Sequence, residues 1–393
     1  VFYELGHSAS LADSRAAVSK LHAPGLNINY GDAEGNIAWW GAARLLIRPE
    51  HVNSYVILDG ASGKDEVLGY RDFSENPQSE NPKSGILFNG NNQPGDTGSG
   101  LEPGYYAAEE RAHRIGELLD TAKKNWTADE MKSIQLDTKN PRINNFRKHF
   151  LTLISESSGR SEVFRNAAEV FKNWDGVHNI KAAGPTIYHR LFYHLSLGIF
   201  ADEIEEKGTL VLLNVSLIDK SIPLLLNNPQ APWWDKIDTP DIRETQAEIL
   251  RTAWINAVQS LEKDYGSNVK SWEWGRIHTL EIKHLLGRKK PLNLFFNIGP
   301  FPVPGSKGVV NQLRHKYGPK ELKVSSGPST RRVIDFGNPE NSAGINPSGQ
   351  AGYFFDQNYQ NQTPLYLAGE YRTQRMNRED ILANKISRLI FRP

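Results

Sequence analysis

The order of apolar and polar positions divides the chain into three stretches. From about residue 20 to 100, short apolar runs alternate with Gly, Pro, Asn and Asp, which is typical of strands and turns. From 101 to 290 the apolar positions recur at helical spacing. From 291 to 393 the short runs and turn residues return. Because strands and helices occupy separate stretches, the pattern favours an α+β fold with antiparallel sheets.

The first predicted hairpin has an unusual polar face. LNINYG at 26–31 and the run at 36–47 read as two strands joined by a tight turn. Asn27 and Asn29 lie two residues apart and therefore share one face of the strand. Asn is depleted in strands because its side chain competes for backbone hydrogen bonds. Further strands are predicted within 54–59, 85–90, 292–305, 331–337 and 350–355.

The predicted helices carry explicit end signals. Thr127 and Glu130 have the spacing of a capping box. Ser161 is a candidate N-cap for a helix over 162–174, whose apolar residues recur at helical spacing. A longer helix is predicted to begin at Thr239–Pro240, with Pro at the first helical position, and to end at Gly266. Another is expected within 105–125.

Composition narrows the classes of protein. The 393 residues carry a net charge of +1, which gives no overall electrostatic reason to expect nucleic acid or membrane as a partner. The short basic pairs, such as Lys289–Lys290, are interpreted as solvated surface. No cysteine is present, which excludes disulfides, thiolate metal sites and a cysteine nucleophile. The most apolar stretch, at 208–226, is interrupted by polar residues and Pro223, so no membrane span is predicted.

Short catalytic motifs are absent. The sequence has no HExxH, and the pairs His189/His194 and His278/His284 lack the spacing that places two ligands on one helix face. We interpret them as core or surface histidines. PGSKG at 304–308 lacks the order of a phosphate-binding loop and is read as a turn. No GxSxG or GxGxxG occurs.

The residues alone leave two interpretations of Asn27. It is either a polar residue of a half-exposed strand, or a rigidly held amide donor that stabilises an oxyanion in acyl transfer. A donor of that kind needs orienting, and the guanidinium of Arg48, in LLIRP, is a candidate for that role.

Six segments, taken in order, resemble consecutive motifs of the penicillin acylase family. They are LHAPGLNINYGDAEGNIAWWGAARLLIRP (21–49), NPKSGILFNGNNQP (81–94), ERAHRIGELLDTAKKNWTADEMKSIQLDTKN (110–140), FPVPGSKGVVN (301–311), GPSTRRVIDF (327–336) and NPSGQAGYFFDQNYQNQ (346–362). Each match is short, and the order of the set makes the resemblance specific.

This resemblance implies an N-terminal nucleophile hydrolase. The family fold is a four-layer α-β-β-α sandwich with antiparallel sheets, which we expect to be incomplete here and to carry a helical insertion. Residues 1–393 would be the C-terminal portion of a β-chain, with a β/turn part at 20–100, a mainly helical part at 101–290 and a second β/turn part at 291–393. No initiator Met or signal peptide is visible, so we expect a fragment or a processed chain.

Family membership would also imply the chemistry. Relatives hydrolyse amide bonds of N-acylated small molecules through the N-terminal Ser of a self-processed β-chain, whose α-amine acts as the base. No cofactor is expected for the chemistry and no metal at the site, although some members carry a structural calcium ion. The expected partners are the substrate, the α-chain and the N-terminal part of the β-chain. By analogy, the protein would be periplasmic or secreted.

Two site residues carry over from the family pattern. The oxyanion Asn precedes the Asp of its aromatic-Ala-Asp motif by five positions, and that Asp matches Asp32, so the oxyanion donor corresponds to Asn27 and not to Asn29. The Arg that contacts it corresponds to Arg48. In this assignment Asn27 donates to the oxyanion, and Arg48 holds Asn27 in place.

The sequence departs from the family in several places. Nothing matches the nucleophilic Ser, so this chain alone is expected to be inactive. Gly31 stands where the family has Ala. The family motifs His-Tyr-x-Asp and Gly-Gln-Ser-Gly read Asn-Tyr-Gln-Asn at 358–361 and Gly-Gln-Ala-Gly at 349–352. Two alternatives stay open: a catalytically inactive acylase-like binding or scaffold protein, and an unrelated α+β domain with an aromatic-rich, carbohydrate-binding surface.

Overall fold

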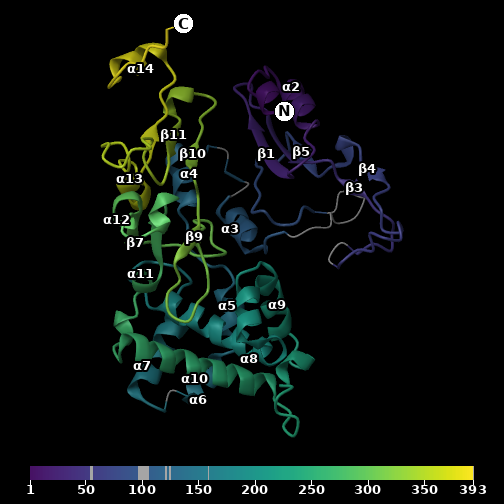
Figure 1. Ribbon diagram of the computed structural model, residues 1–393, viewed down its shortest axis with the longest axis vertical. Coiled ribbons are helices and arrows are strands. Elements are labelled where there is room, and N and C mark those ends of the chain that lie inside the picture. The colour runs from purple at the N-terminus through teal and green to yellow at the C-terminus, as the bar shows by residue number, and fades with distance from the viewer. Residues whose placement is uncertain (54–55, 96–105, 120–121, 124, 158, 393) are drawn as a thin grey trace. The chain divides into compact units, whose positions relative to one another are not determined.

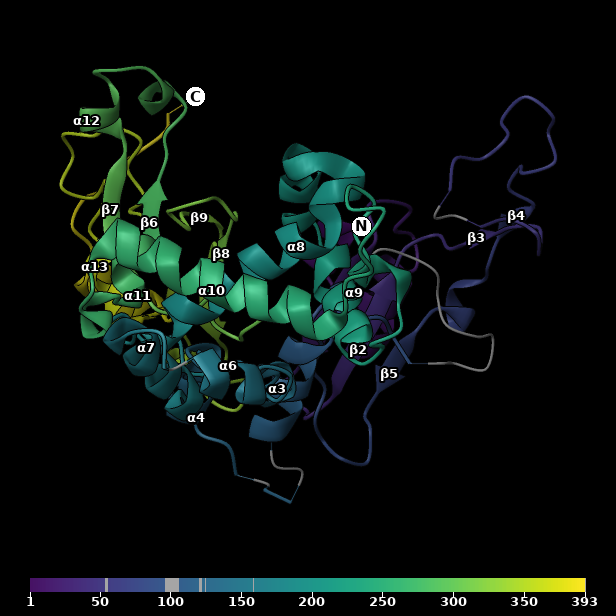
Figure 2. The ribbon, with the colours of Figure 1, turned by 90° about the horizontal axis from the view of Figure 1, so that it is seen from below.

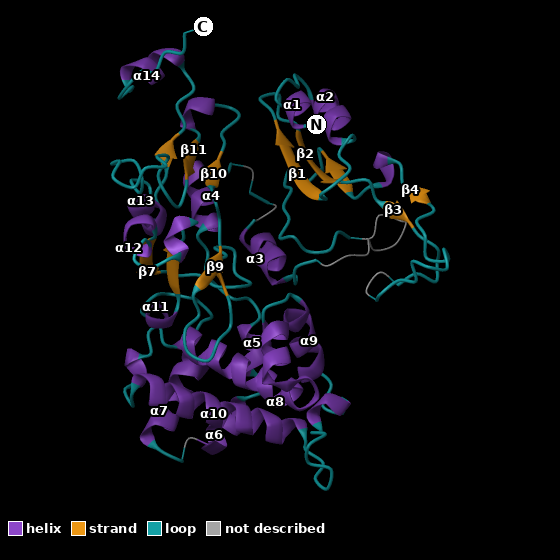
Figure 3. Cartoon of the chain, viewed as in Figure 1, coloured by secondary structure: helices purple, strands orange, loops and turns teal. Residues whose placement is uncertain are grey.

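The chain folds into two compact units. The computed structural model describes residues 1–53, 56–95, 106–119, 122–123, 125–157 and 159–392 (Figures 1 and 3). Unit 1 comprises Val1–Trp126, Ile334–Asn341 and Met376–Pro393, and unit 2 comprises Thr127–Val333 and Ser342–Arg375. Both units combine helices with small sheets whose paired strands are antiparallel. The predicted α+β class is confirmed.

Unit 1 is built around a three-stranded sheet in the order β1-β2-β5. Its elements are α1 (Phe2–Leu5), α2 (Leu11–Val18), β1 (Leu26–Gly31), β2 (Ile37–Ala42), β3 (Leu46–Ile47), β4 (Gly69–Tyr70), the 3-10 turn η1 (Phe73–Glu75), β5 (Gln78–Glu80), α3 (Glu110–Leu118), the 3-10 turn η5 (Pro339–Asn341) and α14 (Arg378–Ala383). The strand predicted at 26–31 is confirmed. The predictions for 85–90 and for the described part of 54–59 are wrong, because neither segment pairs with a strand.

Buried apolar residues occupy every second position of β2, so they all lie on one face of the hairpin of β1 and β2. Ala38, Trp40 and Ala42 are buried with Val18 and Leu21, the latter just beyond α2, in a small core. This alternation matches the two-residue period of a strand, so one face packs on α2, while the other, which carries Asn27, Asn29 and Trp39, is less buried.

The connecting turn is held by one carboxylate. Asp32 accepts hydrogen bonds from the backbone N–H and the side-chain Nδ2 of Asn36 at 2.8 and 2.9 Å. Gly35 has a φ of 89°, a left-handed conformation that glycine adopts without steric cost.

Unit 2 contains a large helical core. Its helices and 3-10 turns are α4 (Ala128–Gln135), α5 (Ile143–Arg147), α6 (Leu151–Ser157), α7 (Glu162–Asn173), α8 (Gly184–Leu213), α9 (Leu217–Leu226), η2 (Pro232–Trp234), α10 (Gln246–Tyr265), η3 (Val269–Ser271), α11 (Trp274–Ile277), η4 (Leu286–Arg288), α12 (Asn293–Phe296) and α13 (Thr363–Ala368). The long helices α8 and α10 pack together, and Leu191, Leu195, Trp254 and Leu261 between them are fully buried.

Capping residues in the sequence predicted several helix ends correctly and one helix start wrongly. The capping box of Thr127 and Glu130 is present, and Ser161 caps α7. The predicted start at Thr239–Pro240 is wrong, because α10 begins at Gln246. Thr245 and Glu248 form a reciprocal capping box there, which satisfies two of the amides at the helix start. The predicted end at Gly266 is confirmed.

The apolar stretch at 208–226 spans the last turns of α8 and all of α9. Within α8, Glu205 has a φ of 59° and interrupts the helical backbone. Among the helices that the structure describes, none has both the length and the apolar character needed to cross a bilayer.

The described strands of unit 2 form three small sheets. They are β6 (Thr279–Ile282), β7 (Ile298–Pro302), β8 (Arg314–His315), β9 (Val324–Ser326), β10 (Arg331–Val333), β11 (Ala343–Ile345) and β12 (Arg372–Thr373), paired as β6-β7, β8-β9 and β10-β11-β12. Strands β7 and β10 lie inside predicted runs, but the first part of the run predicted at 292–305 is wrong, because Asn293–Phe296 form helix α12. The prediction for 350–355 is wrong, because this segment forms turns.

Segments that are distant in the sequence meet in unit 2. Buried Arg331 donates to the side-chain oxygen of Asn311 and to the carbonyl of Tyr366, both at 3.0 Å. The amides of Gly349 and Ala351 donate to the carbonyls of residues 359 and 358. A Cβ at position 349 would lie 1.7 Å from the Asn358 carbonyl oxygen, so only glycine permits this approach.

Candidate functional site

Asn27 lies on the face of β1 that α2 does not cover. Across the hairpin it is paired with Gly41, and Asn29 is paired with Trp39. Asn27 and Asn29 are exposed, whereas Trp40 on the other face of β2 is fully buried. The glycine opposite Asn27 has no side chain to cover the amide, so the amide is accessible to a reacting group in this unit.

The Asn27 amide is held by an indole. Trp39 Nε1 donates to Asn27 Oδ1 at 2.8 Å. An indole N–H can only donate, so the atom that faces it is the carbonyl oxygen of the amide, and the orientation of the amide is thereby assigned. Its Nδ2 group is left as the donor, as an oxyanion site requires. Trp39 is the site residue that sequence reasoning missed, although the diagonal pairing of a short hairpin would have indicated it.

The surrounding strand positions are rigidly bonded. Buried Asn76 donates through Nδ2 to the carbonyls of Gly41 and Ala43 at 2.9 and 2.8 Å. At the other end of β1, the Tyr30 hydroxyl donates to Asp32 at 2.8 Å. Burial, together with that bond to a carboxylate, raises the pKa of Tyr30 to about 12. The phenol therefore stays protonated and keeps donating at neutral pH.

The glycine at position 31, where the family pattern has Ala, is explained by the space available there. A Cβ at this position would lie 2.7 Å from the ring of Phe336, which packs over the end of β1. The residue that departs from the family pattern thus accommodates an aromatic ring that comes from a distant part of the sequence.

Arg48 lies outside the strand that pairs with Asn27. Strand β2 ends at Ala42, and Arg48 follows β3, which pairs with β4 in a separate two-stranded sheet. The expectation that Arg48 ends the second strand of the hairpin is therefore wrong. Within the described part of unit 1, no hydrogen bond or ion pair joins Arg48 to Asn27. The orienting role of Arg48 stays a prediction.

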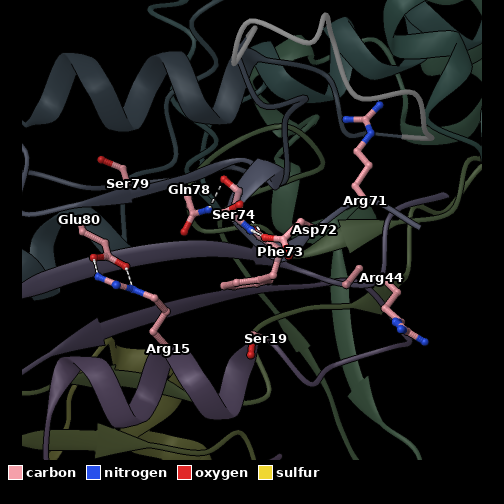
Figure 4. A pocket seen from close by; sticks show the side chains of 11 residues that line it. Arg15, Ser19, Arg44, Arg71, Asp72, Phe73, Ser74, Gln78, Ser79 and Glu80 are labelled. Carbon is pink, nitrogen blue, oxygen red and sulfur yellow. Dashed lines mark hydrogen bonds and ion pairs between the residues drawn. The ribbon is translucent and has the colours of Figure 1, made fainter. Parts of the chain in front are cut away.

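An open cavity of about 720 Å³ lies on the α2 side of the sheet (Figure 4). Asn27 does not line it. Arg15 donates twice to Glu80, which also accepts from Trp40 Nε1 at 2.8 Å. The hydrogen bond from Arg15 lowers the pKa of Glu80. Arg44 and Arg71 point in different directions in Figure 4 and do not converge on one point.

Unit 2 buries a cluster of histidines that no sequence motif indicated. His189 Nε2 lies 3.1 Å from His178 Nε2 and 2.9 Å from Ser306 Oγ, and its Nδ1 lies 2.8 Å from the Tyr317 hydroxyl. A serine beside a histidine can be a nucleophile and its base. Ser306 is completely buried, however, so no substrate reaches it. His278 and His315 pack against the same Trp274. We conclude that this cluster is structural. This agrees with the sequence interpretation of His189 and His278 as core or surface histidines.

The described residues contain no group of three or more His, Asp or Glu side chains arranged to hold a metal ion. A structural calcium ion in the full-length protein stays a prediction, since other parts of that protein could supply its ligands.

The fold has a counterpart among solved structures. A penicillin G acylase from Alcaligenes faecalis superposes with a TM-score of 0.64 at 17% sequence identity, covering 99% of this chain and 72% of that one. At this identity the likeness concerns the fold alone, and it shows that the helices and small antiparallel sheets are part of the α+β fold of penicillin acylases.

Sequence comparison assigns the family. The penicillin amidase family model matches residues 1–383, and the chain therefore belongs to this family. It is 25% identical to the acyl-homoserine lactone acylase QuiP of Pseudomonas aeruginosa over 418 residues, or 98% of this chain and 48% of that protein. It is also 24% identical to penicillin G acylase of Escherichia coli, over 92% of this chain and 44% of that protein. The chain thus spans about half the length of these curated relatives.

Proposed function

We propose that this chain is part of an amidohydrolase that cleaves the amide bond of an N-acylated small molecule. The observation that carries the proposal is the family match over nearly the whole chain, to a family whose named relatives are acylases. Asn27 would donate a hydrogen bond to the oxyanion of the tetrahedral intermediate. The nucleophile would be an N-terminal Ser supplied outside this chain, so residues 1–393 alone would not turn over substrate.

The geometry at Asn27 supports this role. Its amide is exposed on the open face of the hairpin, and the bond from Trp39 turns its N–H donors away from the indole. A fixed donor stabilises a developing negative charge without reorganising during the reaction, which is the basis of oxyanion stabilisation.

The test is hydrolysis by the full-length protein. Release of free amine would be measured with a panel that includes penicillin G and acyl-homoserine lactones of different chain length. Asn27→Ala is expected to lower kcat about 100-fold or more, the typical cost of one oxyanion donor. Asn29→Ala, two positions along the same face, is the matched control and should stay within a few-fold of the unaltered enzyme. Equal effects of the two substitutions would refute the assignment.

An inactive acylase-like scaffold protein is the alternative. The residue at the start of the mature β-chain distinguishes the two functions. A self-cleaving junction followed by Ser, together with hydrolysis, supports the enzyme. A different residue at that position with no hydrolysis supports the scaffold.

The partners and location follow from the same proposal. The α-chain and the N-terminal part of the β-chain would complete the site and select the acyl group. The protein would act in the periplasm or outside the cell. Chelation should leave kcat unchanged, because no metal takes part in the chemistry. A lower unfolding temperature after chelation would indicate the structural calcium ion.

A further inference from the structure

The β6–β7 hairpin of unit 2 ends in a strongly apolar surface. Figure 2 shows α12 at the far end of this hairpin from α10 and α11. Six large apolar side chains are at least half exposed there: Leu285 (69%), Leu286 (51%), Leu294 (76%), Phe295 (51%), Tyr353 (61%) and Phe355 (70%). We call these six residues, with Arg288, Lys289 and Lys290, the tip surface. Exposed apolar patches of this kind mark interaction sites in soluble proteins.

The aromatic residues of the tip surface are joined through the ring of Phe354. The ring of Phe354 lies 4.7 Å from that of Phe296, 5.8 Å from Phe295 and 4.2 Å from Phe355. The Tyr359 hydroxyl donates to the carbonyl of Phe296 at 2.5 Å. The loop at 353–359 is therefore attached to α12, and its aromatic side chains extend the surface of that helix.

The hairpin end is also pre-organised. Asn297 accepts from the backbone N–H of His284 at 3.1 Å and donates to Glu281 and to the carbonyl of Gly287. A Cβ at Gly287 would lie 1.9 Å from Asn297 Oδ1, so the two segments are in close contact. The exposed leucines thus lie on a segment that is held in place by hydrogen bonds.

Positive charge flanks the apolar patch. Arg288, Lys289 and Lys290 are consecutive and exposed, and none forms an ion pair with any residue that the structure describes. Lys283 is paired with Glu281 at 3.6 Å. From 283 to 307 the sequence contains no Asp or Glu, and Asp356 is the one acid in the adjoining loop at 346–361. The chain is almost neutral overall, so its net charge does not indicate this local excess of positive charge.

We propose that the tip surface binds the surface of an anionic phospholipid bilayer. Leucine and aromatic side chains would enter the headgroup boundary, while the long basic side chains keep their charges at the phosphates. Lysine is depleted in protein–protein interfaces, whereas basic residues beside exposed apolar ones are typical of interfacial membrane binding. Charge complementarity therefore favours a lipid surface over a second polypeptide. The proposal is independent of the hydrolase function.

Because the chain has no cysteine, one dye can report on the tip surface. Leu294→Cys would carry an environment-sensitive fluorophore, and Ser267→Cys, in an exposed loop of the same unit, would be the matched control. Phosphatidylcholine vesicles with about one quarter phosphatidylglycerol should shift the emission at position 294 to the blue, and pure phosphatidylcholine should do so much less. No shift at 294, or equal shifts at both positions, would overturn the proposal.

Vesicle sedimentation with charge variants tests which residues are responsible. R288Q/K289Q/K290Q should weaken binding about 100-fold, from about fivefold per basic residue. The control R165Q/K263Q/K270Q removes the same charges from exposed positions of unit 2 and should bind as the unaltered protein does. Equal loss in both variants would mean unspecific charge attraction and contradict the proposal. A further outcome is that the unaltered protein does not bind vesicles while L285S/L294S/F295S changes the oligomeric state. In that case the surface binds a polypeptide and the proposal is wrong.

Discussion

The Asn27 amide is oriented in this unit by the indole of Trp39, and among the residues that the structure describes no guanidinium is hydrogen-bonded to it. The resemblance to the penicillin acylase family pointed to this asparagine through its distance to Asp32 within one hairpin, and its role stays a prediction. The resemblance did not identify the partner, since the direction of a side chain across a strand pair depends on register. The Phe336 ring beside Gly31 was equally out of reach, because it comes from a segment about 300 residues away in the sequence.

Trp39→Phe should separate orientation from packing. Phenylalanine keeps most of the apolar contact and removes the N–H, and one hydrogen bond contributes about 1 kcal/mol. We expect kcat of the full-length enzyme to fall about fivefold, with KM almost unchanged and the unfolding temperature lower by at most a few degrees. Trp233→Phe, at an exposed position of unit 2, is the control. A kcat that does not change for Trp39→Phe would show that another group orients Asn27.

Elements were predictable from sequence where local signals decide the structure. Strand β1 and helix α7 have clear periodicity and clear ends, and both were predicted within a residue. Helix α8 was not predicted, because it is buried on several sides and its apolar residues do not gather on one face of the helix. The predicted strands at 85–90 and 350–355 failed because a strand needs a partner, and sequence pattern does not supply one.

The start of α10 offers a direct measurement of a local signal. Thr245→Ala removes the side-chain acceptor of the capping box and should lower the free energy of unfolding by about 1 kcal/mol. Thr245→Ser keeps the hydroxyl and should restore most of that loss. Urea titration followed by circular dichroism measures both. If serine proved as destabilising as alanine, the threonine would act through packing and not through its hydrogen bond.

At the scale of the whole molecule, four histidines enter the core of unit 2 from separate elements. Burial lowers the pKa of His178 to about 3 and of His278 to about 4, and holds those of His189 and His315 well below the ordinary value. No pattern in the sequence brings these residues together, because His189 meets Ser306 and His315 across more than one hundred positions. Their shared burial makes stability depend on pH.

The sign of this dependence follows from proton binding. Between pH 6.5 and 5.5 the unfolded chain protonates these histidines while the folded chain does not, so stability falls as the pH falls. Each contributes about 1 kcal/mol over that interval. Glu203, whose pKa is raised to about 7 by burial and by the hydrogen bond with Asp202, changes stability in the opposite direction, and solvent reduces its contribution because the side chain is only partly buried. His194, whose pKa is lowered to about 4 by burial, adds to the loss in the same way, so we expect a net loss of about 4 kcal/mol, measured by urea unfolding at the two pH values.

His315 provides the decisive variant, since neither of its ring nitrogens has a hydrogen-bond partner among the described residues. His315→Leu therefore removes a titrating group without leaving a partner unbonded, and it should reduce the loss between pH 6.5 and 5.5 by about 1 kcal/mol. His22→Gln, at an exposed position, should leave the dependence unchanged. If His315→Leu unfolds with the same pH dependence as the unaltered chain, His315 is already accessible to protons in the folded state. The acid sensitivity would then have to arise from the other histidines of the cluster.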